Sequence, residues 1–146
     1  MKVLILKTKW NEEIVDSLAR AAAISLKMAN IETETMTVPG ALEIPLAVKW
    51  AWSKAQREQK ALDGIVACGC VIKGDTYHFE IVATESARAL SQLSLDLRLP
   101  IGNCILTVYK KSDAEERCGE SDKNRGIEAA EAVIEMLALK KEKEFA

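Results

Sequence analysis

The only histidine of the chain, His78, lies near the end of segment 69–80, whose sequence is GCVIKGDTYHFE. Histidine is the side chain that most readily gains and loses a proton near neutral pH, so it is the simplest candidate for general acid or base catalysis. The competing interpretation is a surface histidine or a hydrogen-bonded core histidine, and a lone histidine favours it. The neighbours of His78 therefore decide how much weight the catalytic hypothesis carries.

Gly74, Asp75 and Thr76 precede this histidine and are expected to form a turn from a strand into a helix. Free backbone N–H groups and the helix dipole favour an anion at such a turn, where a phosphate would lie one turn from His78. Ordinary capping explains the same residues equally well, because Asp75 or Thr76 would satisfy the first turn of the helix. A phosphate site and a simple cap both remain open here.

The elements that would position these residues alternate regularly along the chain. Apolar or β-branched runs predict strands at residues 3–6, 32–38, 64–72 and 101–108. A short polar helix is predicted at residues 110–118. Four longer helices are predicted from apolar residues at helical spacing, with the stripes Ile14, Leu18, Ala22 and Leu26; Ile44, Val48, Ala51 and Ala55; Ala83, Ala87, Leu90 and Leu97; and Ile127, Ala130, Ile134, Leu137 and Ala138.

Strands that alternate with helices predict right-handed crossovers and a parallel sheet with helices on both faces. We therefore predict one α/β domain over residues 1–146, a three-layer sandwich with a four-stranded parallel, flavodoxin-like sheet flanked by helices. Ligands of such sheets bind beyond the carboxyl ends of the strands. Those ends are followed by residues 9–11, 38–43, 72–78 and 107 onward, so the candidate residues are expected at one edge of the sheet.

Composition and charge exclude several classes of protein. The chain has 146 residues, of which 49% are hydrophobic, so it can form a real core and is not expected to be disordered. Lys and Arg number 20 against 22 Asp and Glu, without a basic stripe, which argues against a nucleic-acid partner. No apolar run approaches the length of a membrane span, and the start of the chain does not look like a signal peptide.

The four cysteines, at positions 68, 70, 104 and 118, lack C-x-x-C spacing, and only one histidine could complete a metal site. Strand geometry places the α-carbons of Cys68 and Cys70 about 6.6 to 7 Å apart, at or beyond the usual limit for a disulfide. We therefore predict no metal site, and reduced, partly buried thiols in a cytoplasmic protein.

Five segments of the chain resemble the signature blocks of the lumazine synthase family, in the family's order and with near-family spacing. They are residues 38–45 (VPGALEIP), 71–80 (VIKGDTYHFE), 105–107 (ILT), 116–119 (ERCG) and 124–126 (NRG). The resemblance implies condensation of 5-amino-6-(ribitylamino)uracil with 3,4-dihydroxy-2-butanone 4-phosphate in riboflavin biosynthesis. This transferase reaction gives 6,7-dimethyl-8-ribityllumazine, releases phosphate and water, and uses neither a metal nor an organic cofactor.

The resemblance also implies roles for individual residues. His78 falls on the position that the family uses for proton transfer. The remaining positions fall on the family's substrate contacts: Trp10 against the pyrimidine; Ala41, Leu42 and Glu43 at the ribityl chain and ring; Cys70, Val71 and Ile72 with their backbone at the pyrimidine edge; and Asp75, Thr76 and Arg117 at the phosphate.

The chemistry of the side chains fits these implied roles to different degrees. An indole such as Trp10 stacks well on a flat heteroaromatic, although a core position is the alternative. An ionised Glu43 accepts hydrogen bonds from hydroxyl groups, but without the resemblance it would be read as a first-turn helix charge. The planar fork of Arg117 suits phosphate oxygens, but alone it would be read as an exposed helix charge. Asp75 beside a phosphate is unfavourable unless it points away.

The chain departs from the family pattern at two places. Asn103 occupies a position where many members place a phenylalanine that the neighbouring subunit contributes to the same pocket. An asparagine there weakens the aromatic enclosure of the ring but could hydrogen-bond the pyrimidine. The segment 123–126, KNRG, replaces the usual GNKG, which keeps one positive charge and adds another.

The resemblance implies a homo-oligomer, because family sites lie between adjacent subunits of a pentamer. Trp50 and Trp52 support an interface independently, since helix geometry points them about 200° apart and a monomer would bury only one. Shell-forming members usually have an extra N-terminal segment and a glycine-flanked turn, where this chain has ESDK at 120–123. We therefore predict a free pentamer rather than an icosahedral 60-mer.

Two other functions compete with catalysis. The same fold could act as a non-catalytic flavin- or lumazine-binding oligomeric module, an alternative for which Asn103 leaves room. A receiver-type domain would need acidic residues at the end of the first strand, where residues 7–9 are KTK. The presence of His78, Arg117 and Glu43 favours the enzyme.

Overall fold

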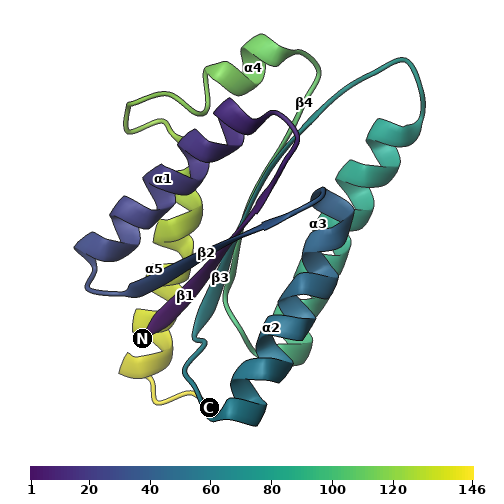
Figure 1. Ribbon diagram of the computed structural model, residues 1–146. Coiled ribbons are helices and arrows are strands. Elements are labelled where there is room, and N and C mark those ends of the chain that lie inside the picture. The colour runs from purple at the N-terminus through teal and green to yellow at the C-terminus, as the bar shows by residue number, and fades with distance from the viewer.

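The computed structural model describes all 146 residues around one four-stranded parallel sheet (Figure 1). The strands are β1 (Lys2–Thr8), β2 (Glu32–Val38), β3 (Gly64–Ile72) and β4 (Ile101–Val108), and their spatial order is β2-β1-β3-β4. This order is that of the first four strands of a flavodoxin-like sheet, with the topological switch point between β1 and β3. The predicted fold class is confirmed.

Helices cover both faces of the sheet (Figure 1). On one face lie α1 (Glu12–Met28) and α5 (Arg125–Glu142), and on the other lie α2 (Ile44–Glu58) and α3 (His78–Leu97). Two short helices complete the chain: the 3-10 helix η1 (Ala41–Glu43) before α2, and α4 (Lys111–Glu115) after β4. The helix α4 is shorter than the segment 110–118 that the sequence predicts.

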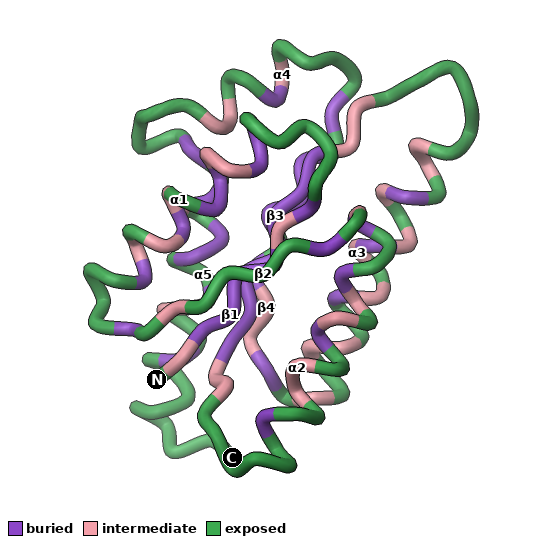
Figure 2. Tube along the Cα trace, viewed as in Figure 1, coloured by how far each residue is buried: buried purple, intermediate pink, exposed green.

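Two apolar clusters separate the sheet from its helices. The larger has 20 buried residues between the sheet and α1 and α5, and the smaller has 12 between the sheet and α2 and α3. Strands β1, β3 and β4 are accordingly the most deeply buried part of the chain, whereas the edge strand β2 is mostly exposed (Figure 2). Strand β3 is buried on both faces along its first seven residues, as its run of small and β-branched residues predicts.

Two helices turn slightly different faces inward from those predicted. The buried residues of α3 are Val82, Ser86 and Leu90, whereas Ala83 and Ala87 are only half-buried. Ser86 escapes a hydropathy pattern, yet its hydroxyl donates to the carbonyl of Ala83 at 3.4 Å and so can occupy the core. The buried residues of α5 include small ones, Gly126, Ala129, Ala130, Val133 and Leu137, while Ile127 and Ile134 lie at the flank.

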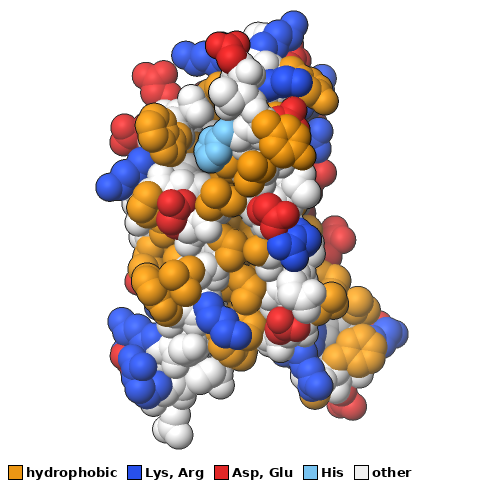
Figure 3. Space-filling model, turned by 90° about the vertical axis from the view of Figure 1, so that its right-hand side faces the viewer, with side chains coloured by type: hydrophobic (Ala, Val, Ile, Leu, Met, Phe, Trp, Pro, Cys, Tyr) orange, Lys and Arg blue, Asp and Glu red, His pale blue; other side chains and the backbone are white.

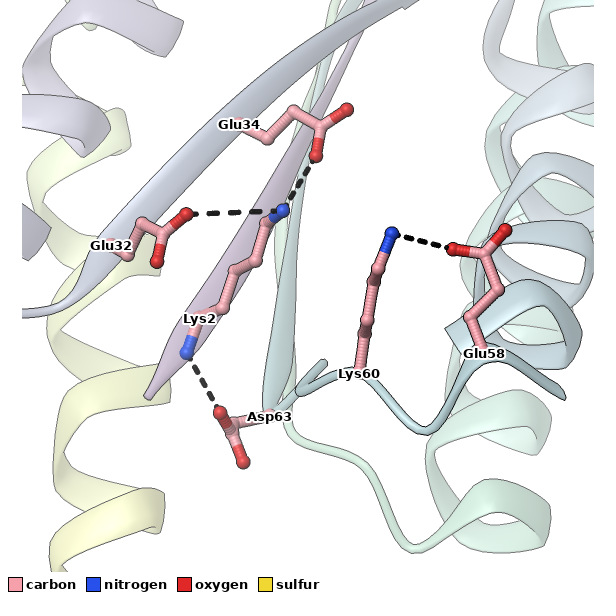
Figure 4. A network of polar contacts seen from close by, with 6 residues as sticks. All are labelled: Lys2, Glu32, Glu34, Glu58, Lys60 and Asp63. Atoms are coloured by element: carbon pink, nitrogen blue, oxygen red, sulfur yellow. Dashed lines mark hydrogen bonds and ion pairs between the residues drawn. The ribbon is translucent and has the colours of Figure 1, made fainter. Parts of the chain in front are cut away.

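An ion network at the amino ends of β1 and β2 joins Lys2 to three carboxylates (Figure 4). The ammonium of Lys2 lies 2.8 Å from Glu34 and 4.0 Å from Glu32, and its backbone N–H donates to Asp63 at 2.7 Å. The hydrogen bond from Lys2 lowers the pKa of Glu34 below its usual 4.5, and the same bond raises the pKa of Lys2. Both groups are largely solvated, which limits their contribution.

We expect Glu34→Gln to lower the melting temperature by roughly 1–2 °C at pH 7. The depressed pKa of Glu34 means that its ion pair stabilises the fold above the unfolded pKa and is lost as the pH falls through the folded value. The variant and the unchanged protein should therefore melt together in acid below the folded pKa of Glu34. Melting curves at both pH values test this, and an equal difference at both would contradict it.

None of the helices is long and apolar enough to cross a membrane. No cluster of three or more His, Cys, Asp or Glu side chains is arranged to hold a metal ion.

Candidate active site

A cavity of about 490 Å³ opens at the carboxyl ends of β1 and β3, beside the switch point of the sheet. Eight of the twelve residues that the sequence singles out line it: Trp10, Ala41, Leu42, Glu43, Cys70, Val71, Ile72 and His78. Four segments bring them together, namely the turn after β1, the 3-10 helix η1, the end of β3 and the start of α3. The structure therefore gathers residues that are up to 68 positions apart, as the rule for parallel sheets predicts.

An indole and a carboxylate stand on either side of Gly40 in this cavity. A Cβ built on Gly40 would lie 3.1 Å from Oε2 of Glu43 and 3.8 Å from Cδ1 of Trp10. The absence of a side chain at Gly40 thus leaves room between the two groups. Trp10 is 74% exposed, so its ring is free to stack against a ligand, and the alternative of a core position is wrong.

The end of β3 extends beyond its neighbour β1 and forms the floor of the cavity. Pairing between β1 and β3 stops at Lys7 opposite Cys68, whereas β3 continues to pair with β4 as far as Ile72 opposite Val108. Beyond Cys68, backbone pairing therefore holds β3 on the β4 side only. Their backbone is the polar surface that the cavity offers to a planar ligand.

Cys70 also borders this cavity, but its thiol is not a nucleophile at neutral pH. Burial raises its pKa to about 11, and the nearby thiol of Cys118 adds to the shift. Only the thiolate reacts readily, so Cys70 contributes shape to the cavity rather than covalent chemistry. Cys68 and Cys70 both belong to the cluster under α1 and α5, which confirms that they face the same side of the strand.

His78 begins α3 at the mouth of the cavity, and its side chain is exposed and makes no hydrogen bond within the chain. Figure 3 shows the histidine set among hydrophobic side chains on the face formed by α2 and α3. Its backbone N–H donates weakly to Oγ1 of Thr76, at 3.4 Å. Asp75 caps no helix N–H, and both Asp75 and Thr76 lie in the exposed loop next to the cavity rather than in its lining.

Arg117 and Asn103 do not share this cavity. They line a second one of about 380 Å³ that runs along the edge strand β4 and the start of α5, and no residue is common to the two. Asn103 is the third residue of β4 and lies well before the carboxyl end of that strand. Within one chain, His78 and Arg117 therefore serve different cavities.

The second cavity is cationic at its outer end, where a polar hollow of about 570 Å³ adjoins it. Arg117, Lys123 and Arg125 line this hollow together with Glu116 and Glu128. One arm of Arg117 donates to the carbonyl of Asp113 at 2.7 Å, which orients the rest of the guanidinium. Arg125 pairs with Glu128 at 2.7 Å and Arg117 lies 3.7 Å from Glu116, whereas Lys123 makes no ion pair.

Asn103 is partly engaged by its own strand. Its Oδ1 accepts a hydrogen bond from the backbone N–H of Ile105 at 2.9 Å. This bond satisfies one backbone donor on the outer edge of β4. The Nδ2 group remains free to donate into the cavity.

Five further residues line the first cavity, and three of them, Asn11, Pro39 and Gly40, lie within the strand-end ranges that the sequence predicts, although no role was assigned to them. Sequence reasoning missed Thr8 and Val82, of which Thr8 ends β1 and could have been included by the rule about carboxyl ends. Asn11 is the most informative of the five, because its Nδ2 donates to the carbonyl of Cys70 at 3.1 Å and joins two strands that are distant in the sequence.

The fold and the cavity define the chain as a flavodoxin-like α/β protein with a cavity at the switch point of the sheet, where ligands of this class of sheet bind. Comparison with known proteins gives the family. A sequence profile described as 6,7-dimethyl-8-ribityllumazine synthase matches residues 1–141. The chain belongs to this family, whose members are transferases of riboflavin biosynthesis.

Individual relatives support the same assignment. The 6,7-dimethyl-8-ribityllumazine synthase of Bartonella tribocorum is 50% identical over 139 residues, which covers 95% of this chain and 89% of the relative. A protein of the same name from Methylobacterium sp. strain 4-46 is 49% identical over 97% of this chain and 78% of the relative. The corresponding protein of Nitrobacter hamburgensis is 44% identical over 96% and 86% of the two chains.

Proposed function

We propose that this chain condenses 5-amino-6-(ribitylamino)uracil with 3,4-dihydroxy-2-butanone 4-phosphate to form 6,7-dimethyl-8-ribityllumazine. The observation that carries the proposal is the first cavity, where Trp10, Glu43 and His78 surround the free backbone end of β3. In this proposal the ring of the uracil lies against Trp10, its edge meets the β3 backbone, and Glu43 accepts hydrogen bonds from the ribityl hydroxyls.

The reaction needs repeated proton transfers. The amine of the uracil attacks the butanone carbonyl, water leaves as the Schiff base forms, phosphate is eliminated, and ring closure releases a second water. His78 at the mouth of the cavity serves as the group that moves protons between nitrogen, carbon and oxygen. Holding both substrates in one site removes the entropic cost of their encounter and supplies much of the remaining acceleration.

The complete site forms between two subunits in this proposal. His78 and Arg117 line separate cavities of one chain, so a substrate that needs both must bridge two copies. Arg117 and Asn103 of one copy then meet the first cavity of its neighbour, and Thr76 and Asp75 flank the phosphate there. An interface in which different surfaces meet closes into a ring when the rotation between copies allows it.

Exposed apolar side chains support such a ring. The face formed by α2 and α3 carries Leu46, Trp50, Ile81 and Leu95, each more than 40% exposed (Figure 3). Trp52 packs against the cluster beneath α2 while Trp50 stays 67% exposed, which confirms that one chain buries only one of them well. We propose a pentamer, which sedimentation would reveal as a mass about five times the 16.1 kDa of the chain.

We expect Arg117→Ala to raise the KM for the butanone phosphate about tenfold to a hundredfold, because charge-assisted hydrogen bonds to phosphate are lost. The KM for the ribitylaminouracil should stay within about twofold, since that substrate carries no phosphate. Steady-state rates of product absorbance measure both constants. Arg88→Ala, which removes an exposed arginine paired with Glu85 on α3, is the control and should change neither.

Mixing two impaired variants tests the site between subunits, with activity measured at a butanone phosphate concentration well below the KM of Arg117→Ala. When His78→Ala and Arg117→Ala chains are unfolded together and reassembled in equal amounts, about a quarter of the interfaces combine an intact His78 with an intact Arg117. We expect the activity to rise to about a quarter of that of the unchanged protein. If the site lay within one chain, the mixture would be no more active than the average of its two components.

A further inference from the structure

We propose that Asn11 is a positioning residue of the first cavity, which fixes the end of β3 and the neighbouring Trp10 for the pyrimidine substrate. The inference rests on the function proposed above. Asn11 would act through the backbone of Cys70 and not through the reacting atoms.

The backbone of Asn11 adopts an unusual conformation for this purpose. Its φ is 55° and its ψ is 50°, the left-handed region that asparagine tolerates better than most residues. It directly precedes α1, where an asparagine side chain usually accepts a hydrogen bond from the helix N–H groups. Here the side chain makes no such cap, and its Nδ2 donates instead to the carbonyl of Cys70 at 3.1 Å.

The register of β3 shows why this bond matters. The N–H groups of Ile65 and Lys73 both donate toward the β4 side, each at 2.9 Å. Backbone groups alternate along a strand, so those of Cys70 and Ile72 point the opposite way, toward β1. The ladder with β1 has already ended at Cys68, and Asn11 supplies a donor where a longer β1 would have supplied a backbone N–H.

Two consequences follow for a ligand. The carbonyl of Cys70 is already occupied, so the backbone groups of Ile72 are those left free on the β1 side of the cavity. The bridge also ties the turn that carries Trp10 to the strand that the ligand edge must meet. Without it, the stacking surface and the hydrogen-bonding edge could move independently. Asn11 therefore sets the register in which a flat heterocycle binds.

The test is the variant Asn11→Gly, which keeps the left-handed backbone available and removes the amide. We expect the KM for the ribitylaminouracil to rise about tenfold, the loss associated with one hydrogen bond, with the KM for the butanone phosphate and kcat within about twofold. Asn30 provides a matched control, since it has a φ of 58° in the turn before β2 and no side-chain hydrogen bond. Asn30→Gly should leave all three constants unchanged.

A second variant separates the bridge from backbone effects. Asn11→Asp keeps the size of the side chain and its tolerance of the left-handed region, but a carboxylate oxygen then faces the carbonyl of Cys70. We expect the KM for the ribitylaminouracil to rise at least as much as in Asn11→Gly.

Three outcomes are decisive. Unchanged kinetics in Asn11→Gly would overturn the inference. A fall in kcat with equal rises in both KM values, accompanied by a lower melting temperature, would overturn it as well. If the unchanged protein formed no product, the proposed function would fall instead. Titration with 6,7-dimethyl-8-ribityllumazine, followed by tryptophan fluorescence, would then test Asn11 directly. A dissociation constant about tenfold higher in Asn11→Gly than in Asn30→Gly would uphold the positioning role, and equal constants would reject it.

Discussion

Replacing His78 by alanine should lower kcat about a hundredfold and leave both KM values within about threefold. The side chain lies at the cavity mouth, makes no hydrogen bond within the chain and belongs to neither apolar cluster, so its removal leaves the fold intact. The expected loss is at the low end for general acid–base catalysis because bringing the two substrates together is unaffected. Single-turnover formation of the lumazine, monitored by absorbance, measures the chemical step directly.

Two further measurements identify proton transfer as the cause. His78→Gln keeps a polar side chain of similar size and should be as slow as His78→Ala. Added imidazole should restore part of the activity of His78→Ala, because the exposed mouth of the cavity admits a small base. A His78→Ala variant within threefold of the unchanged rate would remove the histidine from the mechanism and leave positioning as the sole source of acceleration.

Much of the fold could be predicted from the sequence because the strands are short, apolar and buried. The predicted bounds of β2, β3 and β4 agree with the structure, and β1 is longer than predicted, since Lys2 and Thr8 extend a core of apolar residues. The faces of α3 and α5 were harder to predict. A buried serine in α3 and a row of small residues in α5 pack closely for reasons of size and hydrogen bonding that a hydropathy period does not register.

The site could be predicted only in part, for a topological reason. Residues that follow strand ends were found, because all parallel strands bring their carboxyl ends to one edge. The bridge from Asn11 to Cys70 was missed, because it depends on two features of the sheet. Strands β1 and β3 are neighbours, and their backbone pairing ends at Cys68, before the end of β3. Asn103 and Arg117 were assigned only through the resemblance, and within one chain they border a different cavity, along β4 and the start of α5.

At the contact between α1 and α5, one added methyl group should have a large effect on stability. Gly126, in the first turn of α5, lies directly against the backbone of α1. A Cβ built on it would lie 2.9 Å from the carbonyl carbon of Leu18 and closer still to its oxygen. Asn124 caps the same turn by accepting the N–H of Gly126 at 2.8 Å and donating to Gly119 at 3.0 Å, so the turn cannot shift freely.

We therefore expect Gly126→Ala to destabilise the fold by about 3 kcal/mol and to lower the melting temperature by roughly 6–12 °C. Helix propensity alone predicts the opposite sign, because alanine is about 1 kcal/mol better than glycine inside a helix. The contact prevails because the new methyl group meets rigid backbone rather than a side chain that can rotate away.

Gly119→Ala is the matched control, since nothing lies within 4 Å of its added Cβ and its φ is not positive. Thermal and urea unfolding should show a large loss of stability in Gly126→Ala and almost none in Gly119→Ala. Equal stabilities of the two variants would mean that α5 can move away from α1 without cost.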